Sequence, residues 1–223
     1  KPLIVLIGGA SGVGKTSLAI SLANLLDIPR AVATDDLRQV MRLTLTRELA
    51  PALHASSYTA WKSISSTMGE DAVISGFREQ ARVGCVGGKA IISRCIEENS
   101  SVIIDGVHLI SDLLELETYA GDAFITPVCL GLPDREAFEG RFAQRASEAP
   151  ARPVHRYLEH LDEILKIQDY LIKTSTAPGI PVITTSTVES LTSKVSMVVS
   201  EQLQEQEEIK KALNAARKGR KKQ

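Results

Sequence analysis

Residues 3–16 read LIVLIGGASGVGKT, and this stretch decides the fold of the chain. Residues 3–7 form an apolar run typical of a buried strand, and residues 16–26 have the spacing of a helix. Between them, residues 9–16 match the pattern GxxxxGK[ST] in the strand-to-helix context that this pattern requires. Glycines let consecutive backbone amides surround phosphate oxygens, and the helix N-terminus adds positive potential. The sequence therefore predicts a P-loop that binds a nucleotide.

We expect the loop to bind ATP together with Mg²⁺, with Lys15 contacting the β- and γ-phosphates and Thr16 offering its hydroxyl to the metal. The expected nucleotide-binding residues of this loop are Gly9, Ala10, Ser11, Gly12, Val13, Gly14, Lys15, Thr16 and Ser17. Residues 102–105, VIID, form a second apolar run that ends in a carboxylate, so Asp105 is the second expected magnesium ligand. The alternatives are a glycine-rich turn without a ligand and an aspartate that only caps a turn or a helix.

Composition indicates an ordinary globular protein. The chain has 223 residues, of which 43% are apolar and 24% charged, which predicts a single domain over residues 1–209. No run is long enough to span a membrane, and the apolar start is too short for a secretory signal, so we expect a cytoplasmic protein without a membrane partner. Cys85, Cys95 and Cys129 lack a CxxC pair, which argues against a disulfide framework or a zinc site and predicts small core residues.

Residues 210–223 form a basic tail. They contain lysines and arginines but no acid, which leaves residues 1–209 net acidic. Such a tail could dock on nucleic acid or an acidic surface, but it has no aromatic residue to stack on bases, which argues against nucleic acid. The simpler interpretation is a solvated end of the last helix. Monomer and homodimer both remain open.

Short apolar runs alternate with longer helical stretches, a pattern typical of a parallel sheet with crossover helices. The expected strands are residues 3–7, 31–34, 101–105, 123–130 and 180–184. The expected helices are residues 16–26, 35–45, 70–98, 134–146, 154–175 and 188–213, and the glycines at positions 76, 84, 87 and 88 predict a kink or a break in the third. The predicted fold is α/β: a P-loop NTPase of the nucleoside-monophosphate-kinase-like type, with five parallel strands, flanking helices and a helical lid.

The phosphoryl acceptor should lie beyond the second strand, because ligands of open α/β sheets bind at the carboxyl ends of the strands. Asp35, Arg38 and Arg42 share one stripe of the predicted helix, and Asp36 is adjacent. Asp35 or Asp36 would take the proton of the acceptor hydroxyl, and the arginines would bind its anionic groups. The alternative is an N-cap aspartate followed by surface arginines.

A lid is expected over residues 141–156. Arg141 and Arg145 share a helix face, and together with Arg152 and Arg156 they bracket residues 147–153, where two prolines interrupt the helices. Closure would bring Arg141 and Arg145 to the triphosphate as catalytic cations and exclude water. A solvated helical hairpin is the alternative.

The chain resembles the archaeal-type 2-phosphoglycerate kinases and their relatives. The resemblance rests on the segments GGASGVGKT, TDDLRQVMR, HASSYTAW, DGVHLI, RFAQRA, RYLEHLDEILKIQDYL and GIPVITTST, which extend over nearly the whole chain. It implies transfer of the γ-phosphoryl group of ATP to the primary hydroxyl of 2-phosphoglycerate, giving 2,3-bisphosphoglycerate, or to the 5-hydroxyl of mevalonate 3-phosphate. The partner would be a small anionic metabolite.

The resemblance also implies site residues. It places Asp35, Asp36, Arg38 and Arg42 at the acceptor, with Ser56, Ser57 and Tyr58 as neighbours. His108 would touch the acceptor phosphate, and the alternative is an ordinary turn histidine. Arg152 of the lid is a further expected substrate contact. It places Thr185 and Ser186 at adenine. It further implies that Asp105 replaces a glutamate common among relatives, and that the chain lacks the N-terminal regulatory extension of longer members.

The sequence leaves two other function classes open. A nucleoside or nucleotide kinase would need a base-reading pocket, for which the chain has few aromatic residues: one Trp, four Tyr and four Phe. A non-catalytic nucleotide-binding module would use the basic tail to engage a partner.

Overall fold

A five-stranded sheet forms the centre of the chain in a computed structural model, which describes residues 1–64, 71–148, 155–184 and 187–220. The strands are β1 Leu3–Gly9, β2 Ala31–Ala33, β3 Val102–Asp105, β4 Phe124–Gly131 and β5 Val182–Thr184. They lie in the order β2-β3-β1-β4-β5, and every neighbouring pair is parallel. The predicted parallel α/β sheet is confirmed.

The register of β1 against β3 positions the site. Ile7 is paired with Asp105, so the carboxylate at the end of β3 lies beside the point where β1 enters the glycine loop. β1 is also the central strand of the sheet, and Ile4, Val5 and Ile7 are wholly buried. Burial on both faces explains why residues 3–7 are continuously apolar.

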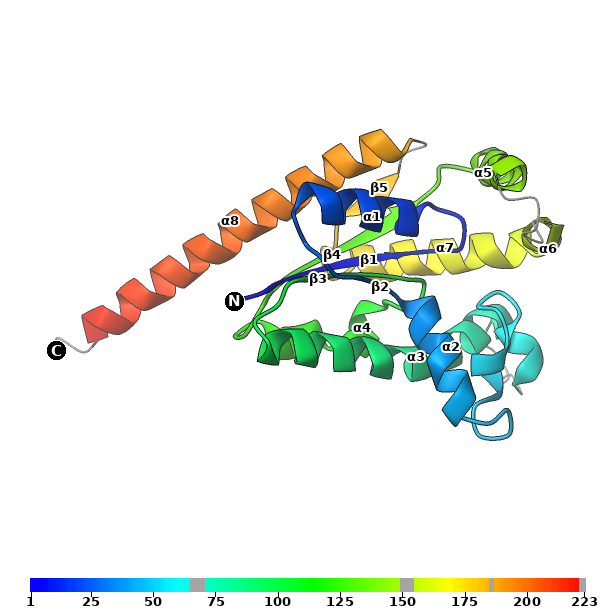
Figure 1. Cartoon of the computed structure of the whole chain (residues 1–223), viewed down its shortest axis with the longest axis horizontal. Helices are drawn as coiled ribbons and strands as arrows, with labels where there is room; N and C mark the ends of the chain where they lie inside the picture. Colours follow the sequence, from blue (N-terminus) through cyan, green and yellow to red (C-terminus); the bar gives the residue numbers. More distant parts are fainter. Residues whose placement is uncertain (65–70, 149–154, 185–186, 221–223) are drawn as a thin grey trace.

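Helices cover both faces of the sheet (Figure 1). The α-helices are α1 Lys15–Leu25, α2 Thr34–Thr44, α3 Ala72–Glu97, α4 Ser111–Leu114, α5 Arg135–Glu148, α6 His155–Glu159, α7 Leu161–Thr176 and α8 Val188–Arg220. The 3-10 helices are η1 Pro51–His54, η2 Ala60–Ser63 and η3 Leu116–Tyr119. Helices α1 and α8 pack together on one face, and α3 packs with α4 and α7 on the other. Helices α2, α5 and α6 gather at the end of the sheet where β1 enters its loop, on the right of Figure 1.

Helix α3 is continuous from Ala72 to Glu97, so the predicted division at its glycines is wrong. Two of its glycines allow close packing of other segments. A Cβ atom on Gly76 would lie 2.3 Å from the backbone nitrogen of Trp61, and one on Gly84 would lie 3.2 Å from Cγ of His108. These glycines let the 3-10 helix η2 and the turn after β3 approach the helix axis. Asp71 fixes the start of α3 by accepting hydrogen bonds from the amides of Val73 and Ile74.

Two other helices differ from their expected bounds. The segment predicted as one helix over 154–175 is divided into α6 and α7 by His160, whose backbone is not helical. Helix α8 continues to Arg220, beyond the expected end at 213, so the predicted boundary between body and tail falls within one helix. In Figure 1 this helix extends past the sheet, with the C-terminus at its far end. None of the described helices is long and apolar enough to cross a membrane. The three cysteines are buried and free, as expected.

Candidate active site

The glycine loop needs two of its glycines for their backbone geometry. Gly12 has φ 99° and Gly14, the N-cap of α1, has φ 97°, a region that other residues rarely adopt. These conformations curl the chain so that α1 begins at Lys15, directly after the loop. The structure therefore has the strand, loop and helix N-terminus that bind nucleotide phosphates.

Lys15 turns back into this loop. Its Nζ atom donates a hydrogen bond of 2.8 Å to the carbonyl of Ala10. Burial lowers the pKa of Lys15 to about 8, although the carboxylates of Asp105 and Asp35 oppose this shift and the charge of Arg145 adds to it. The amine thus lies among an acid from β3, an acid from α2 and an arginine from α5. A phosphate beside the amine would stabilise its charged form.

Thr16 and Asp105 lie where a magnesium ion is expected. The hydroxyl of Thr16 donates a hydrogen bond of 2.9 Å to Oδ2 of Asp105, whose side chain is buried. Burial raises the pKa of Asp105, while Thr16 and Lys15 oppose this shift. Magnesium prefers oxygen ligands and usually takes one or two from protein and others from water and phosphate. These two oxygens fit that pattern, and no group of three or more His, Cys, Asp or Glu forms an all-protein metal site in the described ranges.

Helix α5 covers the glycine loop. A Cβ atom on Gly12 would lie 2.7 Å from Cε1 of Phe142, and one on Gly14 would lie 3.0 Å from Nη1 of Arg141. The guanidinium of Arg141 is therefore against the loop, and burial lowers its pKa, with Arg145 adding to the shift. Both arginines expected in the lid thus lie near the loop, Arg141 at Gly14 and Arg145 within electrostatic reach of Lys15.

Aromatic rings connect α5 to the acceptor side. Phe142 stacks on Tyr157 of α6, with ring centroids 5.0 Å apart and planes 15° apart. Tyr157 in turn lies 5.9 Å from Tyr58, and Tyr58 lies 5.4 Å from His160. Tyr58, expected at the acceptor, is 7% exposed. Tyr58 belongs to the segment that joins η1 and η2, so these ring contacts tie that segment to the helix over the P-loop.

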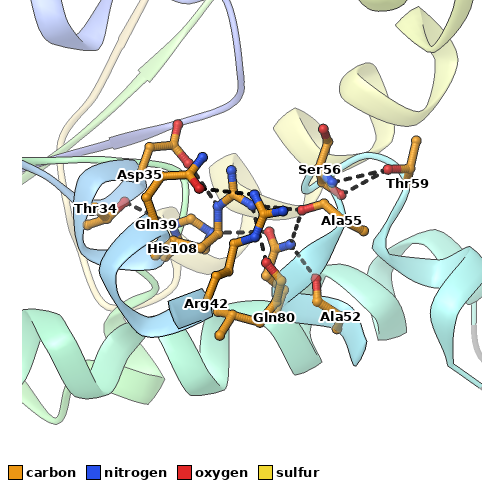
Figure 2. Close-up of polar contacts among 12 residues, drawn as sticks. Thr34, Asp35, Gln39, Arg42, Ala52, Ala55, Ser56, Thr59, Gln80 and His108 are labelled. Atoms are coloured by element: carbon orange, nitrogen blue, oxygen red, sulfur yellow. Dashed lines mark hydrogen bonds and ion pairs between the residues drawn. The ribbon is translucent and has the colours of Figure 1, made fainter. Parts of the chain in front are cut away.

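Helix α2 carries four of the residues expected at the acceptor: Asp35, Asp36, Arg38 and Arg42. The Nε atom of Arg38 lies 3.3 Å from Oδ1 of Asp35, and its Nη1 atom donates to the carbonyls of Leu53 and Ala55 at 3.2 and 2.9 Å. Arg38 therefore anchors the segment after η1 and orients Asp35. Arg42, on the same helix, donates to the neutral side chain of Gln39 at 3.0 Å (Figure 2).

His108 has a different place from the one expected. It is 1% exposed, and its two ring nitrogens contact Thr34 and Gln80. Such a ring cannot touch an acceptor phosphate in this structure, so the expected phosphate contact of His108 is corrected to a buried polar contact. Its burial depends on Gly84 of α3, which leaves room for the ring.

Other expected residues divide into two groups. Asp36 is exposed beside Asp35, and Ser17 is exposed on the first turn of α1. Arg152 of the lid and Thr185 and Ser186 of the adenine loop lie outside the described residues.

Sequence reasoning missed three residues that pack around the candidate site. Phe138 and Phe142 are wholly buried against each other and against the glycine loop. Their spacing on the helix that carries Arg141 was the available signal, because residues four apart share a helix face. Gln80 is also wholly buried, and a lone glutamine within a helical pattern gives no comparable signal.

Solved structures share this fold. They include a gluconokinase from Sinorhizobium meliloti 1021, with a TM-score of 0.51 and 11% identity over 93% of this chain and 95% of that one. A sugar kinase from Janibacter sp. HTCC2649 gives a TM-score of 0.52 and 15% identity over 90% of this chain and 95% of that one. At these identities the likeness concerns the fold alone. No protein-family model matches the chain. The sheet order, the glycine loop and the aspartate beside it define a P-loop protein with the fold of the small-molecule kinases.

Comparison with sequence relatives identifies the family within this class. The chain is 36% identical to a 2-phosphoglycerate kinase of Methanocaldococcus jannaschii over 91% of its own length and 65% of the relative. It is 38% identical to one of Pyrococcus horikoshii, over 87% of its length and 63% of the relative, and 34% identical to one of Thermococcus kodakarensis, over 91% and 68%. The chain belongs to the 2-phosphoglycerate kinase family. It spans about two thirds of the length of these relatives.

Proposed function

We propose that this chain is an ATP-dependent kinase that phosphorylates the primary hydroxyl of 2-phosphoglycerate and gives 2,3-bisphosphoglycerate. One observation carries the proposal: Lys15 of the P-loop, Asp105 of β3 and Asp35 of α2 lie within electrostatic reach of one another. The nucleotide side and the acceptor side therefore share one charge cluster at the carboxyl ends of the strands. The printed names of the relatives support the choice of acceptor.

The structure favours Asp35 over Asp36 as the group that takes the acceptor proton. Asp35 acts electrostatically on Lys15, Asp105 and His108, whereas Asp36 acts on Asp105. In the transfer, the acceptor oxygen bonds to the γ-phosphorus while the bond from that phosphorus to the β–γ bridging oxygen breaks. The hydroxyl proton passes to the Asp35 carboxylate, and ADP leaves with the bridging oxygen.

Arg42 is the better candidate for binding the acceptor anion. In the described part of the chain it forms no ion pair, whereas Arg38 is paired with Asp35 and bonded to two backbone carbonyls. A phosphate or carboxylate would offer the planar guanidinium of Arg42 a bidentate partner. We assign Arg42 to the acceptor and Arg38 to the orientation of Asp35.

The cations around the P-loop suit charge that spreads over the transferring phosphoryl group. Lys15 lies within the loop, Arg141 lies against it, and Arg145 acts on Lys15. Thr16 and Asp105 would hold Mg²⁺, which supplies further positive charge to the β- and γ-phosphates when bound. Helix α5 over the loop would exclude water and so limit ATP hydrolysis.

Two adjacent aspartates offer a matched test. The purified chain is assayed for ADP release with Mg-ATP and, separately, 2-phosphoglycerate, mevalonate 3-phosphate and nucleosides. We expect turnover with 2-phosphoglycerate, a decrease of about 10²–10⁴-fold in kcat for Asp35→Asn, and a decrease below about tenfold for Asp36→Asn. Turnover only with a nucleoside would refute the proposed acceptor. A larger loss in Asp36→Asn than in Asp35→Asn would reverse the assignment of the base.

A further inference from the structure

A buried chain of hydrogen bonds lies behind the acceptor side of the site (Figure 2). Nδ1 of His108 lies 2.8 Å from the hydroxyl of Thr34, and its Nε2 atom lies 3.1 Å from Oε1 of Gln80. The amide nitrogen of Gln80 donates to the carbonyls of Ala52 and Ala55 at 2.7 and 2.9 Å. These contacts join the start of α2, the turn after β3, the middle of α3 and the segment around η1.

Arg38 closes this series of hydrogen bonds into a ring. Its Nη1 atom donates to the Ala55 carbonyl that also accepts from Gln80. Its Nε atom contacts Asp35, which follows Thr34 in the sequence. Asp35, the carboxylate assigned to the acceptor proton, thus belongs to a ring that joins α2 to the segment after η1, to α3 and to the turn after β3.

The donors and acceptors of the ring fix the protonation of His108. The two carbonyls that accept from Nε2 of Gln80 fix the orientation of its amide, so Oε1, which can only accept, faces His108. Nε2 of His108 must therefore carry the hydrogen, and the neutral ring leaves Nδ1 to accept from the hydroxyl of Thr34. Burial lowers the pKa of His108 to about 4, with Asp35 opposing the shift and Arg38 and Lys15 adding to it.

Three members of the ring are closed to solvent and tightly fitted, whereas Asp35 lies at the surface. Thr34 and His108 are 1% exposed, and Gln80 is 0% exposed. A Cβ atom on Gly106 would lie 1.7 Å from the Thr34 hydroxyl, so only glycine at this position lets α2 begin against the end of β3. Gly106 directly follows Asp105, the expected magnesium ligand.

We propose that Thr34, His108 and Gln80 are positioning residues for the acceptor, which hold Asp35 and Arg38 at a fixed place relative to Asp105. This role rests on the proposed kinase function. None of the three touches substrate, because all three are buried. Loss of one link leaves a buried polar atom without its partner and frees the first turn of α2. The loss should affect use of the acceptor and not nucleotide binding, because the glycine loop is held by β1, α1 and α5 and takes no part in the ring.

The chain contains a matched pair of buried threonines for the test. Thr34→Val removes the hydroxyl that donates to His108. Thr126→Val makes the same change on β4, where the residue is 0% exposed and its hydroxyl has no hydrogen-bond partner among the described residues. We expect Thr34→Val to lower kcat/KM for 2-phosphoglycerate at least tenfold, with the Kd of Mg-ADP within about twofold of wild type. Thr126→Val should leave both quantities unchanged.

A second measurement needs no substitution and no acceptor. Long-range ¹H–¹⁵N NMR of the histidine side chains should show His108 as neutral, with Nε2 protonated and Nδ1 bare, at pH 7. A doubly protonated His108 imidazole, or the opposite tautomer, would refute the hydrogen bonds inferred from Thr34 through His108 to Gln80. If wild type phosphorylates 2-phosphoglycerate but Thr34→Val matches Thr126→Val, the positioning role alone fails. If wild type gives no transfer to this acceptor, the proposed function fails, and the positioning role fails with it.

Discussion

The hydroxyl of Thr16 donates a 2.9 Å hydrogen bond to the carboxylate of Asp105, from the first turn of α1 to the end of β3. These residues are 89 positions apart in the chain, and the pairing of β1 with β3 brings them together. Both oxygens are of the kind that Mg²⁺ prefers. The contact therefore marks the expected metal position next to the P-loop.

Thr16→Val should lower kcat about 10²–10³-fold, because a methyl group, which cannot bind a metal, replaces the hydroxyl that is the expected magnesium ligand. Thr16→Ser keeps the hydroxyl and should stay within a few-fold of wild type. Steady-state kinetics over a range of Mg²⁺ concentrations checks the prediction. Equal activity of Thr16→Val and Thr16→Ser would remove Thr16 from the metal site.

Binding of Mg-ADP should take up a proton near pH 8. The pKa of Lys15 is lowered to about 8 in the free protein because the amine is buried, and phosphate beside it would raise that pKa again. Uptake should be on the order of half a proton at pH 8 and should fade toward pH 6.5, where Lys15 is already charged. Calorimetry in buffers of different ionisation enthalpy measures it. Lys15→Met should abolish the uptake, and proton release at pH 8 in wild type would contradict the account.

Gly12→Ala should weaken nucleotide binding at least tenfold. The backbone at Gly12 has φ 99°, and the new Cβ atom would lie 2.7 Å from the ring of Phe142. Strain of this kind costs about 1–3 kcal/mol of stability. Gly140→Ala is the control, since Gly140 is exposed in α5 with nothing near its Cβ position, and it should gain about 0.5–1 kcal/mol. Thermal unfolding and Mg-ADP titration test both variants. An unchanged Kd of Mg-ADP for Gly12→Ala would contradict the role of the loop in nucleotide binding.

Arg42→Ala should raise KM for 2-phosphoglycerate about 10–100-fold and change kcat little, because a charge-assisted contact to the bound acceptor is lost. Arg82→Ala is its charge-matched control, since Arg82 is an exposed arginine of α3 paired with Glu79. It should leave KM unchanged. A change in ATP affinity alone for Arg42→Ala would show that the acceptor lies elsewhere.

The sheet and the glycine loop could be predicted because local sequence determines them. Buried parallel strands need continuous apolar runs, and residues 3–7 and 102–105 supply two of them side by side. The loop pattern has fixed spacing, so Lys15 and Thr16 could be named without a structure. Asp105 could be named because it ends an apolar run.

The rest depends on contacts between distant segments. A histidine after a strand reads the same whether it faces a cleft or the core, and the burial of His108 depends on Gly84 from another helix. The glycines of α3 predict a kink by propensity, yet Gly76 is required for the approach of Trp61. Phe142 covers Gly12 only because α5 crosses the loop. Of these approaches, only that of Phe142 has a local signal, its spacing from Phe138.

Phosphorus NMR of the purified chain with Mg-ATP and 2-phosphoglycerate tests the central claim most directly. The account predicts that the γ-phosphate signal of ATP disappears as signals of ADP and of a second phosphomonoester, on the primary oxygen of the acceptor, appear in equal amounts. Persistence of ATP, or its conversion to ADP and inorganic phosphate without the new ester, would contradict it.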